Sequence, residues 1–291
     1  MFIVFLKKIW YRIYAGLFIK SKAERKKFRK ENILHAEQKY LRKYLNVLNN
    51  LPQKTPLSDD NRKIWICWFQ GIENAPQIVK RCIESIKKNA NGCEVVIIDN
   101  QNIKKYADIP EYIFIKRQQN LITPMQFSDI LRATLLANHG GIWIDATVLL
   151  TAPLSQDFIK RDFFCLSSKG IYRNVNWMIG AKAQNPLMIA EKRFLFAYWA
   201  KETKLIDYFL YPLAFDFLID NDKNLSKLWS MVPAVYEDDC YILEKNYFTP
   251  YTQTMEQDIL QKTSIHKLSY KYDKTKNIEG TFLEKILNNI V

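Results

Sequence analysis

The sequence predicts an α/β fold, in which helices cover a sheet of mainly parallel strands, with a basic helical arm in front of it. Short β-prone runs alternate with helix-length segments from residue 63 onward. One of these runs, residues 142–144, leads directly into Asp145, and open α/β sheets hold their ligands at this end of a strand. Most of the net positive charge lies in the first 54 of the 291 residues, which separates an arm from a nearly neutral globular part.

The arm, residues 1–54, contains 14 Lys and Arg against three acids and so carries +11 of the formal net charge of +13. Three central cations argue against a membrane-spanning helix, and no small-residue cleavage site of a signal peptide follows. We expect an amphipathic helix that binds an anionic membrane surface through residues 1–30; an ordinary helix packed on the domain is the alternative. Its apolar residues recur at helical spacing: Phe2, Phe5, Leu6, Ile9, Ile13 and Leu17.

The next segments form a strand–helix–strand unit. A helix is expected over residues 31–50 and a Pro- and Ser-containing linker over residues 51–62. A buried strand is predicted at residues 63–69, then a helix over residues 75–89 with Asn74 as its cap, then a strand at residues 93–98. Because the two strands are separated by one helix, we expect them to be parallel with a right-handed crossover.

A capped helix at residues 123–139 continues the alternation. Thr123 and Gln126 form a capping box, and Gly140 ends the apolar periodicity. The strand at residues 142–144 follows. Beyond it we predict strands at residues 163–167 and 177–181, helices at residues 186–200 and 211–219, and a polar tail that contains His266.

Composition narrows the class of protein. The five cysteines are odd in number, form no C-x-x-C pair and lie mostly in apolar runs, which favours core positions in a reducing cytoplasm. The arm's aromatic residues cluster with aliphatic ones and are not spaced as base-stacking platforms. A nucleic-acid partner is therefore not expected.

The helix and strand around Asp145 predict a site for a metal–diphosphate group. Asp129 and Arg132 lie three residues apart, so they emerge from one face of the helix. Arg132 either pairs with Asp129 or binds the diphosphate, and Asp129 is suited to accept hydrogen bonds from sugar hydroxyls. Asp145 is the best candidate ligand for Mg²⁺ or Mn²⁺, which prefer oxygen. This layout indicates transfer from a sugar nucleotide.

Other candidate residues lie at the end of the first strand and in the tail. Trp65 and Trp68 are three apart, so they face opposite sides of a strand; one is expected to stack on a base, or both belong to the core. Gly71 after Gln70 allows close approach of the backbone to a ligand. His266 is expected either to close over the diphosphate or to be an ordinary surface histidine.

Five segments resemble the bacterial capsular polysaccharide synthesis proteins, which are related to glycosyltransferases with a DXD sugar-binding motif, including initiating fungal mannosyltransferases and large glucosylating toxins. The similarity covers roughly residues 60–270 and does not reach the arm. The segments are I-W-I-C-W-F-Q-G (64–71), A-P-Q-I-V (75–79), F-S-D-I-L-R (127–132), L-L-A-N-H-G-G-I-W-I-D-A-T-V (135–148) and H-K-L-S-Y (266–270).

The resemblance implies a GT-A (Rossmann-like) domain over residues 60–291. Residues 62–155 would form its nucleotide-binding half, and residues 156–291 the acceptor half and closing segment. By motif match, Asp129, Arg132 and Trp143 would contact the donor, and Asp145 would be the first DXD aspartate. Thr147 replaces the second aspartate, so Asp145, Thr147 and His266 would share Mn²⁺ or Mg²⁺. Ser269 would lie on the segment that folds over the diphosphate.

These observations predict a cytoplasmic glycosyltransferase, bound peripherally to the inner face of the cell membrane. It would move a hexose, with retention at the anomeric carbon, from a nucleotide sugar, with UDP favoured, to a lipid-linked oligosaccharide in surface polysaccharide biosynthesis. Two alternatives stay open: a sugar-phosphate transferase, and a non-catalytic membrane-tethered scaffold of the polysaccharide-synthesis complex.

Overall fold

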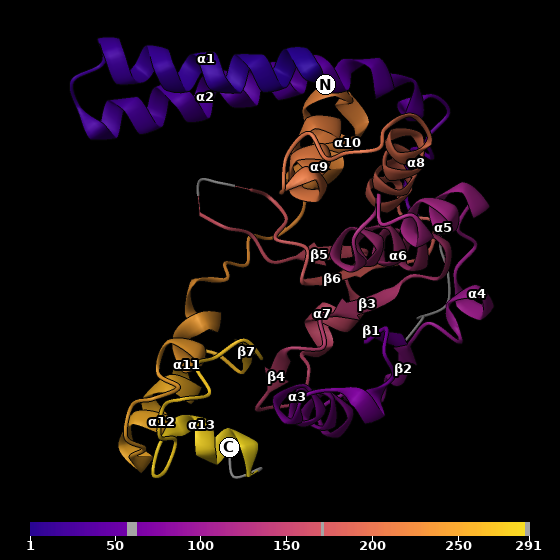
Figure 1. The fold of residues 1–291 in the computed structure, drawn as a ribbon. Helices are drawn as coiled ribbons and strands as arrows, with labels where there is room; N and C mark the ends of the chain where they lie inside the picture. Colours follow the sequence, from indigo (N-terminus) through magenta and orange to yellow (C-terminus); the bar gives the residue numbers. More distant parts are fainter. Residues whose placement is uncertain (57–62, 170–171, 289–291) are drawn as a thin grey trace.

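The computed structural model of the chain describes residues 1–56, 63–169 and 172–288. It consists of an α/β domain with a helical hairpin from the N-terminal arm lying beside it (Figure 1). The predicted fold class is confirmed. The linker predicted at residues 51–62 lies partly outside the described residues.

The main sheet has five strands in the order β2-β1-β3-β6-β5. Strand β1 (Lys63–Cys67) pairs in parallel with β2 (Glu94–Ile98) and β3 (Gly141–Ile144). Strand β6 (Met178–Ala181) is antiparallel to β3 and to β5 (Phe163–Cys165). A second, two-stranded sheet pairs β4 (Val148–Leu150) with β7 (Ile265–Lys267).

Alternation along the strands divides the hydrophobic core into two clusters, one on each face of the main sheet. Trp65, Trp143 and Ile179 belong to the cluster that includes α6 (Pro124–His139), α8 (Pro186–Lys201) and α9 (Leu210–Asn221). Ile64, Ile142 and Met178 belong to the other cluster, with α3 (Gln77–Lys88) and α13 (Phe282–Leu287). Figure 1 shows α6 and α8 on one side of the strands and α3 on the other.

The remaining helical elements are short and connect these layers. They are α4 (Ile103–Tyr106), α5 (Glu111–Gln118), α7 (Gln156–Lys160), α10 (Lys223–Ser230), α11 (Ile242–Lys245), α12 (Gln253–Lys262), and the 3₁₀ helices η1 (Arg42–Leu48), η2 (Ile72–Asn74) and η3 (Asp238–Tyr241).

The arm forms a hairpin of α1 (Phe2–Phe18) and α2 (Lys22–Leu41). Its two helices pack through aromatic rings, such as Tyr14 on Phe28 with ring centroids 5.4 Å apart. The ammonium of Lys8 lies 2.5 Å from Glu37 and 3.3 Å from Asp207, so one cation joins both arm helices to the domain. Among the described residues, no helix is long and apolar enough to cross a membrane.

One side of α1 is left uncovered. Its large apolar side chains are exposed: Ile3, Phe5, Leu6, Ile9, Trp10, Ile13, Leu17 and Phe18. The predicted amphipathic helix is therefore present, and its apolar face is exposed.

Several predicted boundaries need correction. The helix expected over residues 31–50 ends at Leu41 and continues as the 3₁₀ helix η1. Asn74 does not cap α3; its side chain donates to the Gln70 carbonyl, and Pro76 takes the cap position. The polar tail around His266 is a strand, β7, because its partner β4 supplies the hydrogen bonds. Four cysteines, Cys82, Cys93, Cys165 and Cys240, are buried, as predicted.

The link between α6 and β3 fixes the position of the strand that leads to Asp145. The predicted capping box of Thr123 and Gln126 starts α6. At its end Gly140 has φ 67° and Gly141 has φ 96°, in the left-handed region. A Cβ at Gly140 would lie 2.4 Å from the Ala183 nitrogen, and one at Gly141 2.5 Å from the Lys63 carbonyl oxygen. Only glycines therefore allow α6 to turn this tightly into the sheet.

Candidate active site

Two elements place charged side chains at the carboxyl end of β3. Helix α6 supplies Asp129 and Arg132, and the link from β3 to β4 supplies Asp145. The Asp145 N–H donates to the Trp177 carbonyl at 2.9 Å, and the Asp145 carbonyl accepts from the Val148 N–H at 3.0 Å. The backbone of Asp145 is therefore held from both sides.

Arg132 lies at the centre of this group, with only 5% of its side chain exposed. Its Nη1 is 3.2 Å from Oδ1 of Asp129, and its Nη2 is 3.4 Å from Oδ1 of Asp145. Nη1 also donates to the Asn176 carbonyl at 2.7 Å, and the guanidinium stacks 4.9 Å from the Trp143 ring. The structure thus brings together the two acids and the arginine predicted from the sequence.

Asp145 has a hydrogen-bond partner for each oxygen. Trp143 Nε1 donates to Oδ1 at 2.9 Å, and Lys267 Nζ donates to Oδ2 at 2.7 Å. Burial acts to raise the pKa of Asp145, but the nearby cations Lys267 and Arg132 outweigh it and hold the pKa below its usual range. Asp145 is therefore a stable carboxylate at neutral pH.

Asp129 behaves differently. It accepts a hydrogen bond from Asn176 Nδ2 at 3.0 Å. Burial and the neighbouring charge of Asp145 raise the pKa of Asp129 to about 6, despite the opposing effect of Arg132. Two carboxylates that share one arginine are thus tuned to different pKa values, a pattern that is frequent at functional sites.

The cluster opens into a cavity of about 510 Å³. Asp129, Arg132 and Asp145 line one side of it. Trp177 and Tyr241 line another, and both donate to Glu237, at 2.8 and 2.6 Å. Aromatic walls beside a few convergent charged groups are typical of a site for a small polar ligand.

Residues 15–286 match the family model described as capsular polysaccharide synthesis protein. The match spans nearly the whole chain. The protein belongs to the capsular polysaccharide synthesis protein family. The family match also extends into the arm, further than the resemblance over residues 60–270 indicated.

No curated protein sequence gives a significant match to this family member. Among solved structures, the chain is similar to "PaToxG Glycosyltransferase", with 15% sequence identity and a TM-score of 0.40 over 68% of this chain and 84% of that chain. At this TM-score the likeness carries no assignment on its own.

The first strand of this capsular polysaccharide synthesis protein places its two tryptophans in different surroundings. Trp65 is fully buried and donates to the Gly140 carbonyl at 2.8 Å, so it is a core residue that also braces the glycine turn. Trp68 is half-buried, with its ring edge-on to Tyr270 at 5.5 Å. Gln70 is exposed, and Gly71 has φ 82°. Because β1 and β3 are parallel, these residues lie at the same sheet edge as Asp145.

The structure turns His266 away from the charged group. Its side chain is fully buried, its Nε2 lies 3.2 Å from Oγ1 of Thr151, and burial lowers its pKa to about 4. Neighbouring residues on a strand face opposite sides, and Lys267 is the one that reaches Asp145. Sequence reasoning missed Lys267, because the alternation along β7 identifies the residue that faces Asp145 only once the pairing of β7 with β4 is known. Ser269 is held by Tyr247, whose hydroxyl accepts from its N–H at 2.9 Å.

The predicted metal ligands do not form a divalent-metal site in this arrangement. Lys267 Nζ donates to Thr147 Oγ1 at 2.8 Å as well as to Asp145, so the ammonium lies between the two oxygens proposed as ligands. Within the described ranges, no group of three or more His, Cys, Asp or Glu side chains could hold a metal ion. Dependence on Mn²⁺ or Mg²⁺ stays a prediction.

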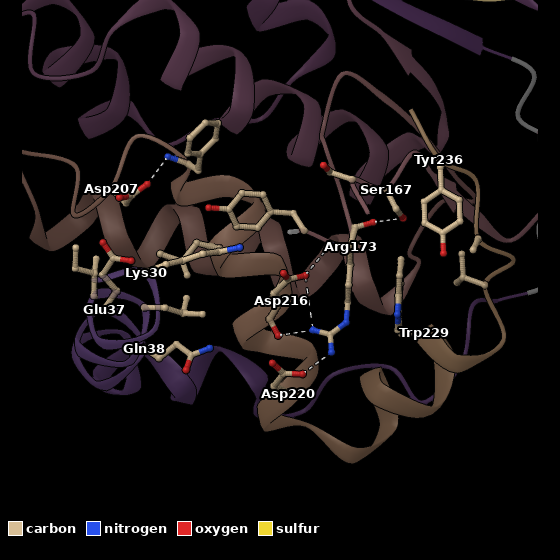
Figure 2. Close-up of a pocket in the computed structure, with 18 residues that line it drawn as sticks. Lys30, Glu37, Gln38, Ser167, Arg173, Asp207, Asp216, Asp220, Trp229 and Tyr236 are labelled. Atoms are coloured by element: carbon tan, nitrogen blue, oxygen red, sulfur yellow. Dashed lines mark hydrogen bonds and ion pairs between the residues drawn. The ribbon is translucent and has the colours of Figure 1, made fainter. Parts of the chain in front are cut away.

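A second cavity, of about 670 Å³, adjoins the first and shares Ser168, Tyr172 and Phe209 with it. Figure 2 shows Lys30 and Glu37 of α2 on one side and Arg173 with Asp216 and Asp220 on the other. Arg173 lies 2.7 Å from Asp220 and 3.6 Å from Asp216. The arm therefore forms one wall of a cavity next to the charged group, which sequence reasoning did not anticipate because the walls are far apart in the chain.

Proposed function

We propose that this protein is a glycosyltransferase that moves a hexose from a nucleotide sugar, with UDP the favoured nucleotide, to a lipid-linked oligosaccharide during assembly of a capsular or other surface polysaccharide. Membership of the capsular polysaccharide synthesis protein family supports a role in capsule synthesis. The observation that carries the proposed activity is Arg132, buried between Asp129 and Asp145 and opening into the 510 Å³ cavity at the carboxyl edge of parallel strands.

The charged groups that line this cavity complement the phosphates and hydroxyls of a nucleotide-sugar donor. Arg132 offers a planar fork of donors for phosphate oxygens, and Asp145 fixes its position. Asp129, once ionised, accepts hydrogen bonds from sugar hydroxyls. The aromatic walls give the sugar and base apolar surface on which to pack.

In the reaction, the bond between the anomeric carbon and the diphosphate oxygen breaks, and a bond to an acceptor oxygen forms as that hydroxyl gives its proton to the leaving diphosphate. Negative charge accumulates on the leaving diphosphate, next to Arg132. Preorganised donors at the position where charge develops are usually the largest single contribution to catalysis. We propose retention of configuration, with catalysis chiefly by positioning and leaving-group stabilisation.

The acceptor is proposed to occupy the 670 Å³ cavity. An acceptor hydroxyl must reach the donor's anomeric carbon, and this cavity adjoins the donor cavity through Ser168, Tyr172 and Phe209. Trp229 and Tyr236 offer flat apolar faces, and the Arg173–Asp216–Asp220 group offers donors and acceptors for hydroxyls (Figure 2).

The arm connects this acceptor site to a membrane surface. Helix α2 lines the acceptor cavity, and its partner α1 leaves a row of large apolar side chains exposed. With that face in the interfacial region of an anionic bilayer, the sugar of a lipid-linked acceptor could enter the cavity while its lipid stays in the membrane. We therefore propose a peripheral location at the inner face of the cell membrane.

Product analysis tests the proposed activity. Purified protein is incubated with a panel of UDP- and GDP-sugars, with and without a membrane extract that contains lipid-linked saccharides, and the nucleotide products are separated. Nucleoside diphosphate released from one donor supports a hexosyltransferase. Nucleoside monophosphate would instead identify a sugar-phosphate transferase. Absence of both turnover and binding across the panel would favour the non-catalytic scaffold.

A further inference from the structure

The ammonium of Lys267 is held between Asp145 and Thr147, the pair of residues at the first and third positions of the D-A-T sequence. Nζ is 2.7 Å from Oδ2 of Asp145 and 2.8 Å from Oγ1 of Thr147. The side chain is 18% exposed, and its ammonium lies 5.7 Å from the ring of Trp177, a residue of the donor cavity. The ammonium thus lies against Asp145 and Trp177, two residues that line the donor cavity.

We propose that Lys267 supplies the positive charge that binds and stabilises the leaving diphosphate, so that the donor binds without a divalent cation. This inference rests on the proposed glycosyltransferase function and concerns the same site.

The charges of the site match this role. A carboxylate and a neutral hydroxyl are a weak ligand set for Mg²⁺ or Mn²⁺, whereas one carboxylate balances one ammonium. An ammonium has three N–H donors. Among the described residues, the contacts to Asp145 and Thr147 use two of these donors, which leaves one for a phosphate oxygen. Arg132, which lines the donor cavity, pairs with the other oxygen of Asp145, so two cations flank this carboxylate.

The strand pairing independently selects Lys267 over its neighbour. Antiparallel pairing matches Val148 with Lys267 and Leu149 with His266. A shift by one residue would exchange the two faces of β7 and bring the imidazole to Asp145. Instead His266 is fully buried against Thr151, and burial keeps it neutral at physiological pH. The cationic side chain that reaches the D-A-T segment is therefore the lysine.

Calorimetric titration of UDP and of GDP into the intact protein, in EDTA and in MnCl₂, tests this role. The proteins compared are the wild type, Lys267→Ala, Lys267→Arg and the exposed-surface control Lys262→Ala. For the wild type and Lys262→Ala we expect one nucleotide to bind equally well in both solutions. Lys267→Ala should lose affinity in EDTA by about 30-fold, the size expected when one partner of a part-buried charge pair is removed. It should recover affinity in MnCl₂, because Asp145 and Thr147 are then open to the ion.

Lys267→Arg keeps the charge and should bind in EDTA, which separates loss of charge from loss of folding. If Lys267 had only a structural role, its removal would not make nucleotide binding depend on Mn²⁺. Wild-type binding that requires Mn²⁺ would overturn the inference while leaving the glycosyltransferase proposal intact. Failure of both nucleotides to bind in both solutions would overturn the proposed function and this inference with it.

Discussion

Trp143 and Asp145 lie two residues apart at the end of β3, and the indole Nε1 of Trp143 donates to Oδ1 of Asp145 at 2.9 Å. The same indole ring stacks on the guanidinium of Arg132 at 4.9 Å. One aromatic side chain therefore orients both charged groups of the proposed donor site.

Trp143→Phe should keep the stacking surface and lose the hydrogen bond. We expect donor turnover to fall by about tenfold, which corresponds to about 1.4 kcal/mol and is at the low end for a hydrogen bond to a charged group. The assay is nucleoside diphosphate release, with Trp10→Phe on the exposed face of α1 as the matched control. Unchanged turnover in a folded Trp143→Phe protein would remove Trp143 from the site.

Turnover should depend on pH through Asp129. Burial raises the pKa of Asp129 to about 6, while Asp145 is held below its usual range and is ionised throughout. The ionised carboxylate of Asp129 accepts hydrogen bonds from sugar hydroxyls through both oxygens, whereas the protonated form must use one oxygen as a donor. Donor turnover should therefore rise between pH 5 and 7 and then level off. Asp129→Asn should abolish this rise.

Asp216 provides the control for that experiment, because burial also raises its pKa to about 6 but it pairs with Arg173 in the second cavity. Without acceptor, Asp216→Asn should keep the rise in donor hydrolysis. A pH profile that is the same in wild type and Asp129→Asn would rule out Asp129 as its origin.

The exposed face of α1 should bind vesicles that contain anionic lipid. Ile9→Glu with Ile13→Glu places two charges in that face, where each buried large apolar side chain contributes about 1.5–3 kcal/mol. We expect vesicle affinity to fall at least tenfold, as measured by co-sedimentation. Ile115→Glu, at an exposed position of α5, is the matched control. Equal sedimentation of all three proteins would show that α1 does not bind the membrane.

Stability should carry a pH-dependent contribution from Glu37, which joins the arm to the domain through Lys8. Burial raises the pKa of Glu37 to about 7, from its ordinary value of 4.5, although Lys8 opposes the shift. The folded state therefore holds the proton more tightly, so this contribution is fully present below about pH 4.5 and is lost as pH rises to about 7.

Glu37→Gln has no such titration, so the stability of wild type relative to this variant should decrease by about 1–3 kcal/mol between pH 5 and pH 8. Chemical denaturation at the two pH values measures this difference. Other titrating groups contribute equally to both proteins and cancel. A difference that does not change with pH would contradict the assignment.

Local signals in the sequence were sufficient for one half of the site. The capping box at Thr123, the glycine turn and the D-x-x-R spacing act within one helix and one strand, and the structure places Asp129, Arg132 and Asp145 together. Long-range pairing decided the other half. Strand β7 has three residues, and its partner β4 lies more than 100 residues earlier, so no local pattern could show that Lys267 faces the site. The second cavity was likewise hidden, because α2 and α9 come together only in the folded chain.

Donor turnover by Asp145→Asn tests the central claim most directly, with Asp157→Asn, an exposed aspartate paired with Arg161, as the control. Asp145 touches Trp143, Arg132 and Lys267, and an amide in its place removes the charge that holds the two cations. With the donor that the wild-type protein hydrolyses, we expect nucleoside diphosphate release to fall about 100-fold or more in Asp145→Asn and to be unchanged in Asp157→Asn. Turnover by a folded Asp145→Asn protein at the wild-type rate would contradict the placement of the donor site at this cluster.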